Sequence, residues 1–194
     1  MRKDKGLMRK EINTTVVEEY PRYVRIQSDI KRLGENQICL HQDQRRKNQQ
    51  SSDSDIIFDA GNENARLNMT VNVDKMKSFA FKLFCDSFMP EPCYRFDSDG
   101  PFHRNPESDG VTLSQRQIPT PHFHKYDEKG RVIAYRTNKL IAEESSLLAD
   151  YEKAMWHFCD EENVVLQPET HVFTETLQLG AHDFVDPLEG VEFP

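Results

Sequence analysis

The sequence contains no stretch of about eighteen consecutive apolar residues, the length that a helix needs to cross a bilayer. The basic start, residues 1–5, is not followed by an apolar segment, so we expect no signal peptide. The four cysteines include no CxxC pair, so the spacing of a structural zinc site is missing. Together these absences predict a cytoplasmic protein with reduced thiols and no contact with a membrane.

Charge is unevenly distributed along the chain. The formal net charge is -8, yet residues 1–50 hold 12 Lys and Arg against 7 Asp and Glu, whereas residues 141–194 hold 1 against 13. Because a partner responds to the local field, the acidic total does not exclude nucleic acid. The mean hydropathy of -0.76 is low for a compact domain. We therefore expect a basic N-terminal extension (1–52), a core domain (53–162) and an acidic C-terminal tail (163–194).

Alternation of apolar and polar residues predicts strands across the middle of the chain. It is clearest at residues 67–73, where every second side chain is apolar. Turn residues before this segment predict a hairpin with residues 56–58. A second hairpin should join residues 121–126 to residues 132–136 through an Asp-Glu-Lys-Gly turn. Further strands are expected at residues 37–42, 79–85 and 94–96.

Helical spacing of apolar residues is visible at residues 143–160, with a serine available as the N-cap. Residues 16–33 fit either a helix with Pro21 near its start or a strand at residues 23–26. These elements predict an α+β fold: an antiparallel sheet of four to six strands with one or two packed helices.

Reactive side chains are densest between residues 94 and 126. His103, His122 and His124 fall within 22 positions of one another. Pro119 and Pro121 favour extended backbone before them. Since side chains two apart on a strand share a face, His122 and His124 should point the same way. The cationic residues nearby in the sequence are Arg95, Arg104 and Lys125.

This stretch resembles the TumE-like toxins of bacterial toxin–antitoxin pairs and related domains, over residues 55–160. The resemblance implies a RelE-like core, endoribonuclease activity, a role in growth inhibition or phage defence, and a cognate antitoxin. The loop at residues 107–117 is longer than in those proteins, and residues 1–50 and 163–194 have no counterpart in them. The matching residues are Tyr94, Arg95, Asp97, Asp99, Gly100, Pro101, His103, Asn105, Pro106, Ile118, Pro119, Pro121, His122, His124 and Tyr126.

Metal-independent RNA cleavage needs a base for the 2′-hydroxyl, an acid for the leaving 5′-oxygen and cations for the transition state. Imidazole suits both proton-transfer roles, because its unperturbed pKa lies near ~6.5. We predict His103, His122 and His124 as catalytic residues, with Asp97, or alternatively Asp99, orienting one ring. This mechanism uses neither a metal nor another cofactor. The predicted substrate-binding residues are Arg95, Arg104, Lys125 and Tyr126.

Two other interpretations of the histidines stay open. His122, His124 and Glu128 match the middle of the cupin signature, in which two histidines and a glutamate bind a metal ion. Arg116 and Tyr135 stand where that signature has glycines, and Glu128 also fits the hairpin turn. Alternatively, each imidazole has only a structural hydrogen bond in its loop.

A third interpretation is a binding module without catalysis. Its partners would be RNA, an antitoxin or another protein, attracted by the basic N-terminal region or the acidic C-terminal region. The acidic tail could also cover a cationic face of the same chain, an effect that salt would weaken.

Overall fold

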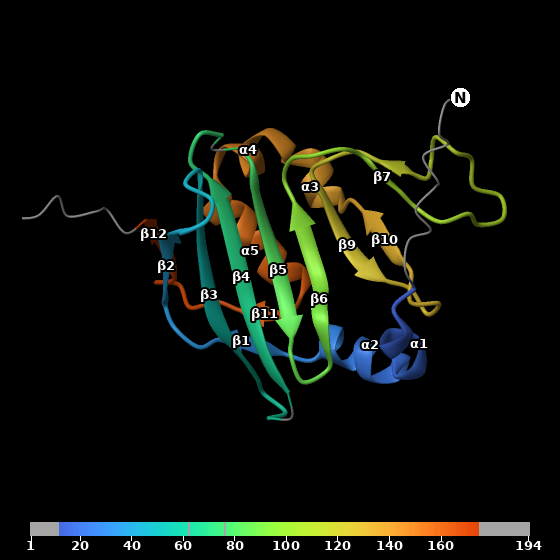
Figure 1. Cartoon of the computed structure of the whole chain (residues 1–194), viewed down its shortest axis with the longest axis horizontal. Coiled ribbons are helices and arrows are strands. Elements are labelled where there is room, and N and C mark those ends of the chain that lie inside the picture. The colour runs from blue at the N-terminus through green and yellow to red at the C-terminus, as the bar shows by residue number, and fades with distance from the viewer. Residues whose placement is uncertain (1–11, 62, 76, 175–194) are drawn as a thin grey trace, which may run out of the picture.

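The computed structural model describes residues 12–174, except residues 62 and 76. It is built around one sheet of ten strands (Figure 1). These strands are β1 (Lys31–Leu33), β2 (Gln37–Gln42), β3 (Gln49–Phe58), β4 (Asn64–Asn72), β5 (Phe79–Cys85), β6 (Met89–Asp97), β9 (His122–Tyr126), β10 (Val132–Tyr135), β11 (Val164–Val165) and β12 (His171–Thr174). A separate short hairpin consists of β7 (His103–Arg104) and β8 (Gln117–Ile118). The helices are α1 (Thr14–Glu18), α2 (Tyr20–Ser28), α3 (Asn138–Ala142), α4 (Glu144–Ala149) and α5 (Tyr151–Glu161).

The main path through the sheet runs β10-β9-β6-β5-β4-β3-β1-β11, and β2 also pairs with β3. Most neighbours are antiparallel, but the last two strands return to the first two and pair with them in parallel. Val164 of β11 lies opposite Lys31 of β1. His171 of β12 lies opposite Gln37 of β2. The sheet is therefore completed only by residues at the far end of the described chain.

The prediction of a RelE-like α+β core with four to six strands is wrong. The protein is mostly β, with ten strands in one mixed, curled sheet and five short helices among the described residues. The prediction undercounted because residues outside the expected core domain supply β1, β2, β11 and β12. The boundary expected between residues 52 and 53 falls inside β3, whose ten residues pair with β4 along almost their whole length.

Alternating burial explains why the central strands form where the sequence predicts them. In β4 and β5 every second side chain is buried, as in Leu67, Met69 and Phe81, and the residues between them are partly exposed. The buried side chains meet α5, whose Phe158 ring lies 5.7 Å from the ring of Phe81. Burial of each such side chain stabilises the fold by about 1.5–3 kcal/mol relative to exposure.

The helical regions are divided into more elements than the sequence predicts. Residues 143–160 form α4 and α5, and Asp150 between them caps α5 by accepting a hydrogen bond from the Lys153 amide. Residues 16–33 are not one helix. They contain α1, α2 and β1, and Pro21 stands in the first turn of α2, where proline is tolerated. No helix in the described ranges is long and apolar enough to cross a membrane.

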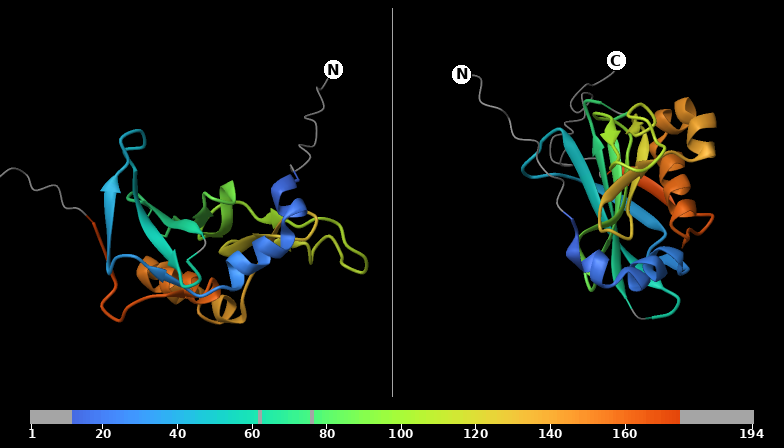
Figure 2. Two further views of the ribbon diagram at one scale, coloured as in Figure 1. Left: turned by 90° about the horizontal axis from the view of Figure 1, so that it is seen from below. Right: turned by 90° about the vertical axis from the view of Figure 1, so that its right-hand side faces the viewer.

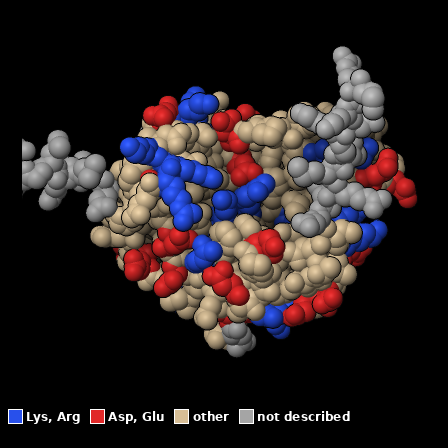
Figure 3. Space-filling model, viewed as in Figure 1, with Lys and Arg blue, Asp and Glu red and all other residues tan. Residues whose placement is uncertain are grey.

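The two faces of the sheet are covered differently. The helices α4 and α5 lie against one face, whereas β2 and the loop that follows it curl away from them on the other side (Figure 2). We call this second face, which carries Lys82, Arg95 and Asp97, the open face. It is the face that Figure 3 shows, with lysine and arginine side chains near its middle.

Candidate functional site

Strand pairing between β6 and β9 brings the reactive residues together on the open face. In the antiparallel register Asp97 lies opposite His122, and Arg95 lies opposite His124. Directly opposed residues on paired strands point to the same side, so these four side chains form a compact group. A cis peptide bond between Thr120 and Pro121 leads the chain into β9.

The loop between β6 and β9 adds the third histidine by fastening itself to the outer edge of β10. The Asn105 side chain donates to the Ala134 carbonyl (2.8 Å) and accepts from the Ala134 amide (2.7 Å), as a neighbouring strand would. The His103 ring nitrogen Nε2 donates to the Val132 carbonyl (3.3 Å). Its imidazole thereby lies beside the other two.

The three imidazoles converge. The ring centroids of His122 and His124 are 4.4 Å apart, and that of His103 lies 4.8 Å from His124 and 6.1 Å from His122. Asp97 Oδ2 lies 3.0 Å from His124 Nε2, and an Arg95 guanidinium nitrogen lies 3.0 Å from that oxygen and 3.1 Å from that nitrogen. His122 and His124 are only 2% and 5% exposed. The two β9 imidazoles are therefore enclosed, whereas Arg95, Asp97 and His103 are partly exposed.

The electrostatics of the cluster favour a neutral His122 beside an ionised Asp97. Burial, and then the neighbouring His124, lower the pKa of His122. Burial alone would raise the pKa of Asp97, but the hydrogen bond from His124 and the charge of Arg95 hold it below its ordinary value. In addition, His122 Nδ1 donates to the Pro119 carbonyl (3.1 Å), which leaves the lone pair on Nε2.

This donor set fits a divalent metal ion. Asp97, His122 and His124 each offer one ligand atom, and the three atoms lie within 4.8 Å of one another. Two imidazoles and one carboxylate form a common catalytic metal set, and a carbonyl that accepts the second N–H of a ligand histidine typically fixes its orientation. The carboxylate is Asp97 of β6. Glu128, the glutamate of the cupin-like interpretation, lies in the turn between β9 and β10 and is not in this group.

No family model matches the chain, and no curated protein or solved structure matches it. The site is therefore interpreted from its own geometry.

The structure does not bring all the predicted site residues together. Lys125 points to the other face of β9, where its ammonium lies 4.8 Å from the centroid of the Tyr135 ring. Arg104 is exposed on β7, next to His103 in the sequence. Tyr126 points to the same face of β9 as His124, two residues further along the strand. The predicted residues that form the cluster are His103, His122, His124, Asp97 and Arg95.

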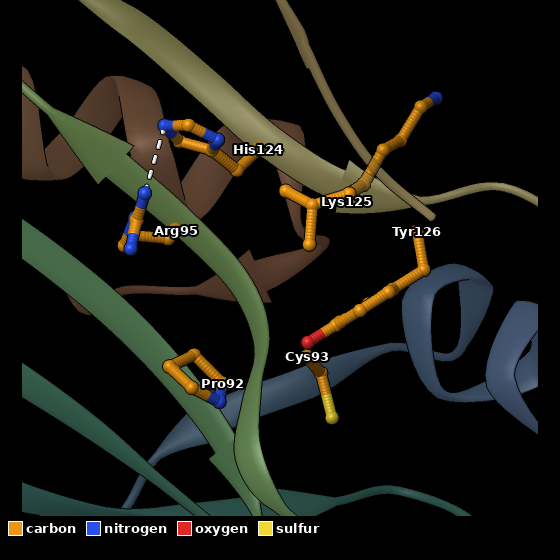
Figure 4. A pocket seen from close by; sticks show the side chains of 7 residues that line it. Pro92, Cys93, Arg95, His124, Lys125 and Tyr126 are labelled. Carbon is orange, nitrogen blue, oxygen red and sulfur yellow. Dashed lines mark hydrogen bonds between the residues drawn. The ribbon is translucent and has the colours of Figure 1, made fainter. Parts of the chain in front are cut away.

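A small cavity of about 60 Å³ adjoins the cluster below Arg95 and His124. Figure 4 shows that Arg95 and His124 border it on one side and that Tyr126, Cys93 and Pro92 complete its wall. The Lys125 side chain extends away from it (Figure 4). Among the residues that line the cavity, Arg95 is the charged one whose side chain lies on the open face. The cavity can therefore accept a small group with negative charge.

Sequence reasoning missed two contributors. One is the Pro119 carbonyl, which fixes the His122 tautomer. The other is Lys82, which lies opposite Arg95 in the register of β5 and β6. The alternation Phe81-Lys82-Leu83 already indicates that Lys82 points away from the core, but only the pairing of β5 with β6 places it beside the site.

Proposed function

We propose that the chain is a divalent-metal-dependent hydrolase whose metal is held by Asp97, His122 and His124. The observation that carries the proposal is the convergence of these three ligand atoms within 4.8 Å, with His122 held in a ligand-competent tautomer. Zinc and divalent iron or manganese all accept two imidazoles and a carboxylate. Such an ion would supply Lewis acidity and an activated water.

Arg95 indicates the substrate class. Its guanidinium lies between the metal ligands and the adjoining cavity, and it presents several N–H donors in a planar fork. Phosphate and phosphodiester groups are the anions that this fork pairs with best. We therefore assign the substrate as a phosphate ester whose anionic oxygens contact Arg95.

The endoribonuclease predicted from the sequence is the second candidate. The convergence of three imidazoles beside a guanidinium supports it, since base, acid and phosphate-binding group would lie within one site. The burial of His122 and His124 weighs against it, because a 2′-hydroxyl must reach the general base. The toxin and phage-defence roles stay predictions from the resemblance alone.

One experiment separates these candidates. Purified protein is stripped with EDTA, reloaded separately with Zn²⁺, Mn²⁺ and Fe²⁺, and assayed for hydrolysis of bis(p-nitrophenyl) phosphate and of an RNA oligonucleotide. Metal content of the wild type, H122A and D97N is measured in parallel. The proposal predicts about one bound ion per chain, metal-restored hydrolysis and loss of both in the variants. RNA cleavage that persists in EDTA would favour the endoribonuclease instead.

A further inference from the structure

A row of directly opposed residues crosses the open face from β3 to the site. Asp53, Asn68, Lys82, Arg95 and His124 are successive cross-strand partners on β3, β4, β5, β6 and β9. Since neighbouring strands lie about 4.8 Å apart, Lys82 stands roughly 10 Å from His124 along this row. The site is therefore one end of a polar track that runs across the sheet.

Lys82 is a partly buried cation whose neighbouring acids are already engaged. The two carboxylates that raise its pKa are Asp97 and Asp53, and each is in an ion pair, Asp97 with Arg95 and Asp53 with Arg66. Burial, together with the charges of Arg95 and Arg46, lowers the pKa of Lys82. Arg95 and Arg46 thus lie close enough to repel Lys82, which has no ion pair of its own among the described residues.

The track continues beyond Lys82 into the loop between β2 and β3. Arg45, Arg46 and Lys47 are consecutive and exposed there. Within the described chain the Arg46 guanidinium donates only to the Gln49 side-chain oxygen (3.2 Å), and no ion pair holds Arg45 or Lys47. Asp43, the acid of this loop, already accepts hydrogen bonds from the amides of Arg45 and Arg46. Lysine and arginine side chains accordingly line the open face from one margin to its middle (Figure 3).

We infer that the open face binds a single nucleic-acid strand, whose phosphates follow the cations Arg45, Arg46, Lys47, Lys82 and Arg95 toward the histidine site. Arg45, Arg46, Lys47 and Lys82 have no ion pair among the described residues, and such a series of cations leading to Arg95 matches the repeated charge of a phosphodiester backbone. A single strand fits because the row crosses five strands, roughly 19 Å, which is within the reach of short single-strand sites on other sheet proteins. The inference goes beyond the proposed hydrolase, because binding needs no metal.

The test uses fluorescence anisotropy of labelled 12-nucleotide oligouridylate and oligothymidylate, in EDTA, at 50 to 200 mM salt. We compare the wild type with two double variants, R46Q/K82Q and R45Q/K47Q. Both changes of the second variant lie in the exposed β2–β3 loop, outside the sheet. The matched control is R25Q/K129Q, which removes two exposed charges from α2 and the β9–β10 turn. Circular dichroism melting checks that all variants are folded.

Each double variant should weaken strand binding roughly tenfold and reduce the slope of log K against log salt by about 1.4, whereas the control should change affinity less than about twofold. Equal binding of the two oligonucleotides assigns recognition to phosphate, and a preference for oligouridylate adds the ribose hydroxyl. Absence of wild-type binding at 50 mM salt, equal losses in the control, or equally effective competition by polyglutamate would each overturn the inference. Because EDTA is present throughout, these outcomes are independent of the hydrolase assay.

Discussion

Replacing Arg95 with glutamine should make the metal ion bind more tightly, although Arg95 lies in the middle of the site. Its guanidinium nitrogen is 3.0 Å from Asp97 Oδ2, so an ion held by this carboxylate would lie about 5 Å from the guanidinium charge. Repulsion between a dication and a monocation at ~5 Å is about 1.7 kcal/mol even in the dielectric of water. Removing it should strengthen binding roughly 15-fold.

The exposure of Arg95 sets a lower limit on the expected gain in metal affinity. The side chain is 39% exposed and can move into solvent when an ion binds. At ~10 Å the repulsion falls to about 0.8 kcal/mol, which corresponds to a gain of roughly fourfold. Isothermal titration of Zn²⁺ into EDTA-stripped R95Q and wild type measures the difference directly.

The control for this titration is R66Q. Arg66 is another guanidinium on the open face, but its partners are Asp53 and Asp86, so its removal should leave Zn²⁺ affinity within about twofold. Unchanged or weaker binding by R95Q would refute the reasoning. In that case the guanidinium would be the permanent counter-ion of Asp97 and no ion would replace it.

Three further perturbations test the fold and the frame of the site. Hydrogen bonds from Arg22, then Ser87, hold the pKa of Glu63 at about 2. A carboxyl group whose pKa is lowered by folding stabilises the folded state at pH values above its unfolded pKa of about 4.5, and this stabilisation is lost as the pH falls toward about 2. E63Q should therefore remove about 1–2 kcal/mol of stability at pH 7. It should also flatten the fall of the unfolding free energy at acidic pH, measured by urea titrations. N105A should cost about 2 kcal/mol for its two hydrogen bonds to Ala134 and, by uncovering the edge of β10, cause concentration-dependent association in light scattering; a monomer of unchanged stability would contradict this. F81A should lower the unfolding free energy by about 3–5 kcal/mol, because Phe81 is fully buried against α5, and a loss below about 1 kcal/mol would show that this packing is not critical.

Local patterns predicted the individual strands well. The strand expected at residues 37–42 is β2, and the two expected hairpins are the pairs β3–β4 and β9–β10. Alternation succeeds here because each of these strands has one face in the core, and turn residues fix the register of neighbouring strands. The total number of strands could not be predicted from local patterns in the same way. Strand β1 has three residues and pairs with β3 and β11, and β11 has only two residues, so both are too short to leave a local signal.

The site shows the same division between local and distant information. The sequence places His122 and His124 on one face, because they stand two apart on a strand. That Asp97 belongs with them depends on β6 pairing with β9 in one particular register, and a shift by one residue would turn it away. Lys125 was expected in the site because it is adjacent in sequence to His124, yet the same alternation that aligns the histidines points it to the opposite face.

The parallel pairing of β12 with β2 has a consequence during synthesis. The partner of residues 37–42 lies about 130 residues downstream, so at about 5–20 residues per second a ribosome needs roughly 7–25 seconds to deliver it. During that interval one edge of the nascent sheet offers unpaired amides and carbonyls to any extended peptide nearby. We therefore expect this protein to depend on chaperones that shield β-strand edges while its last strands are being made.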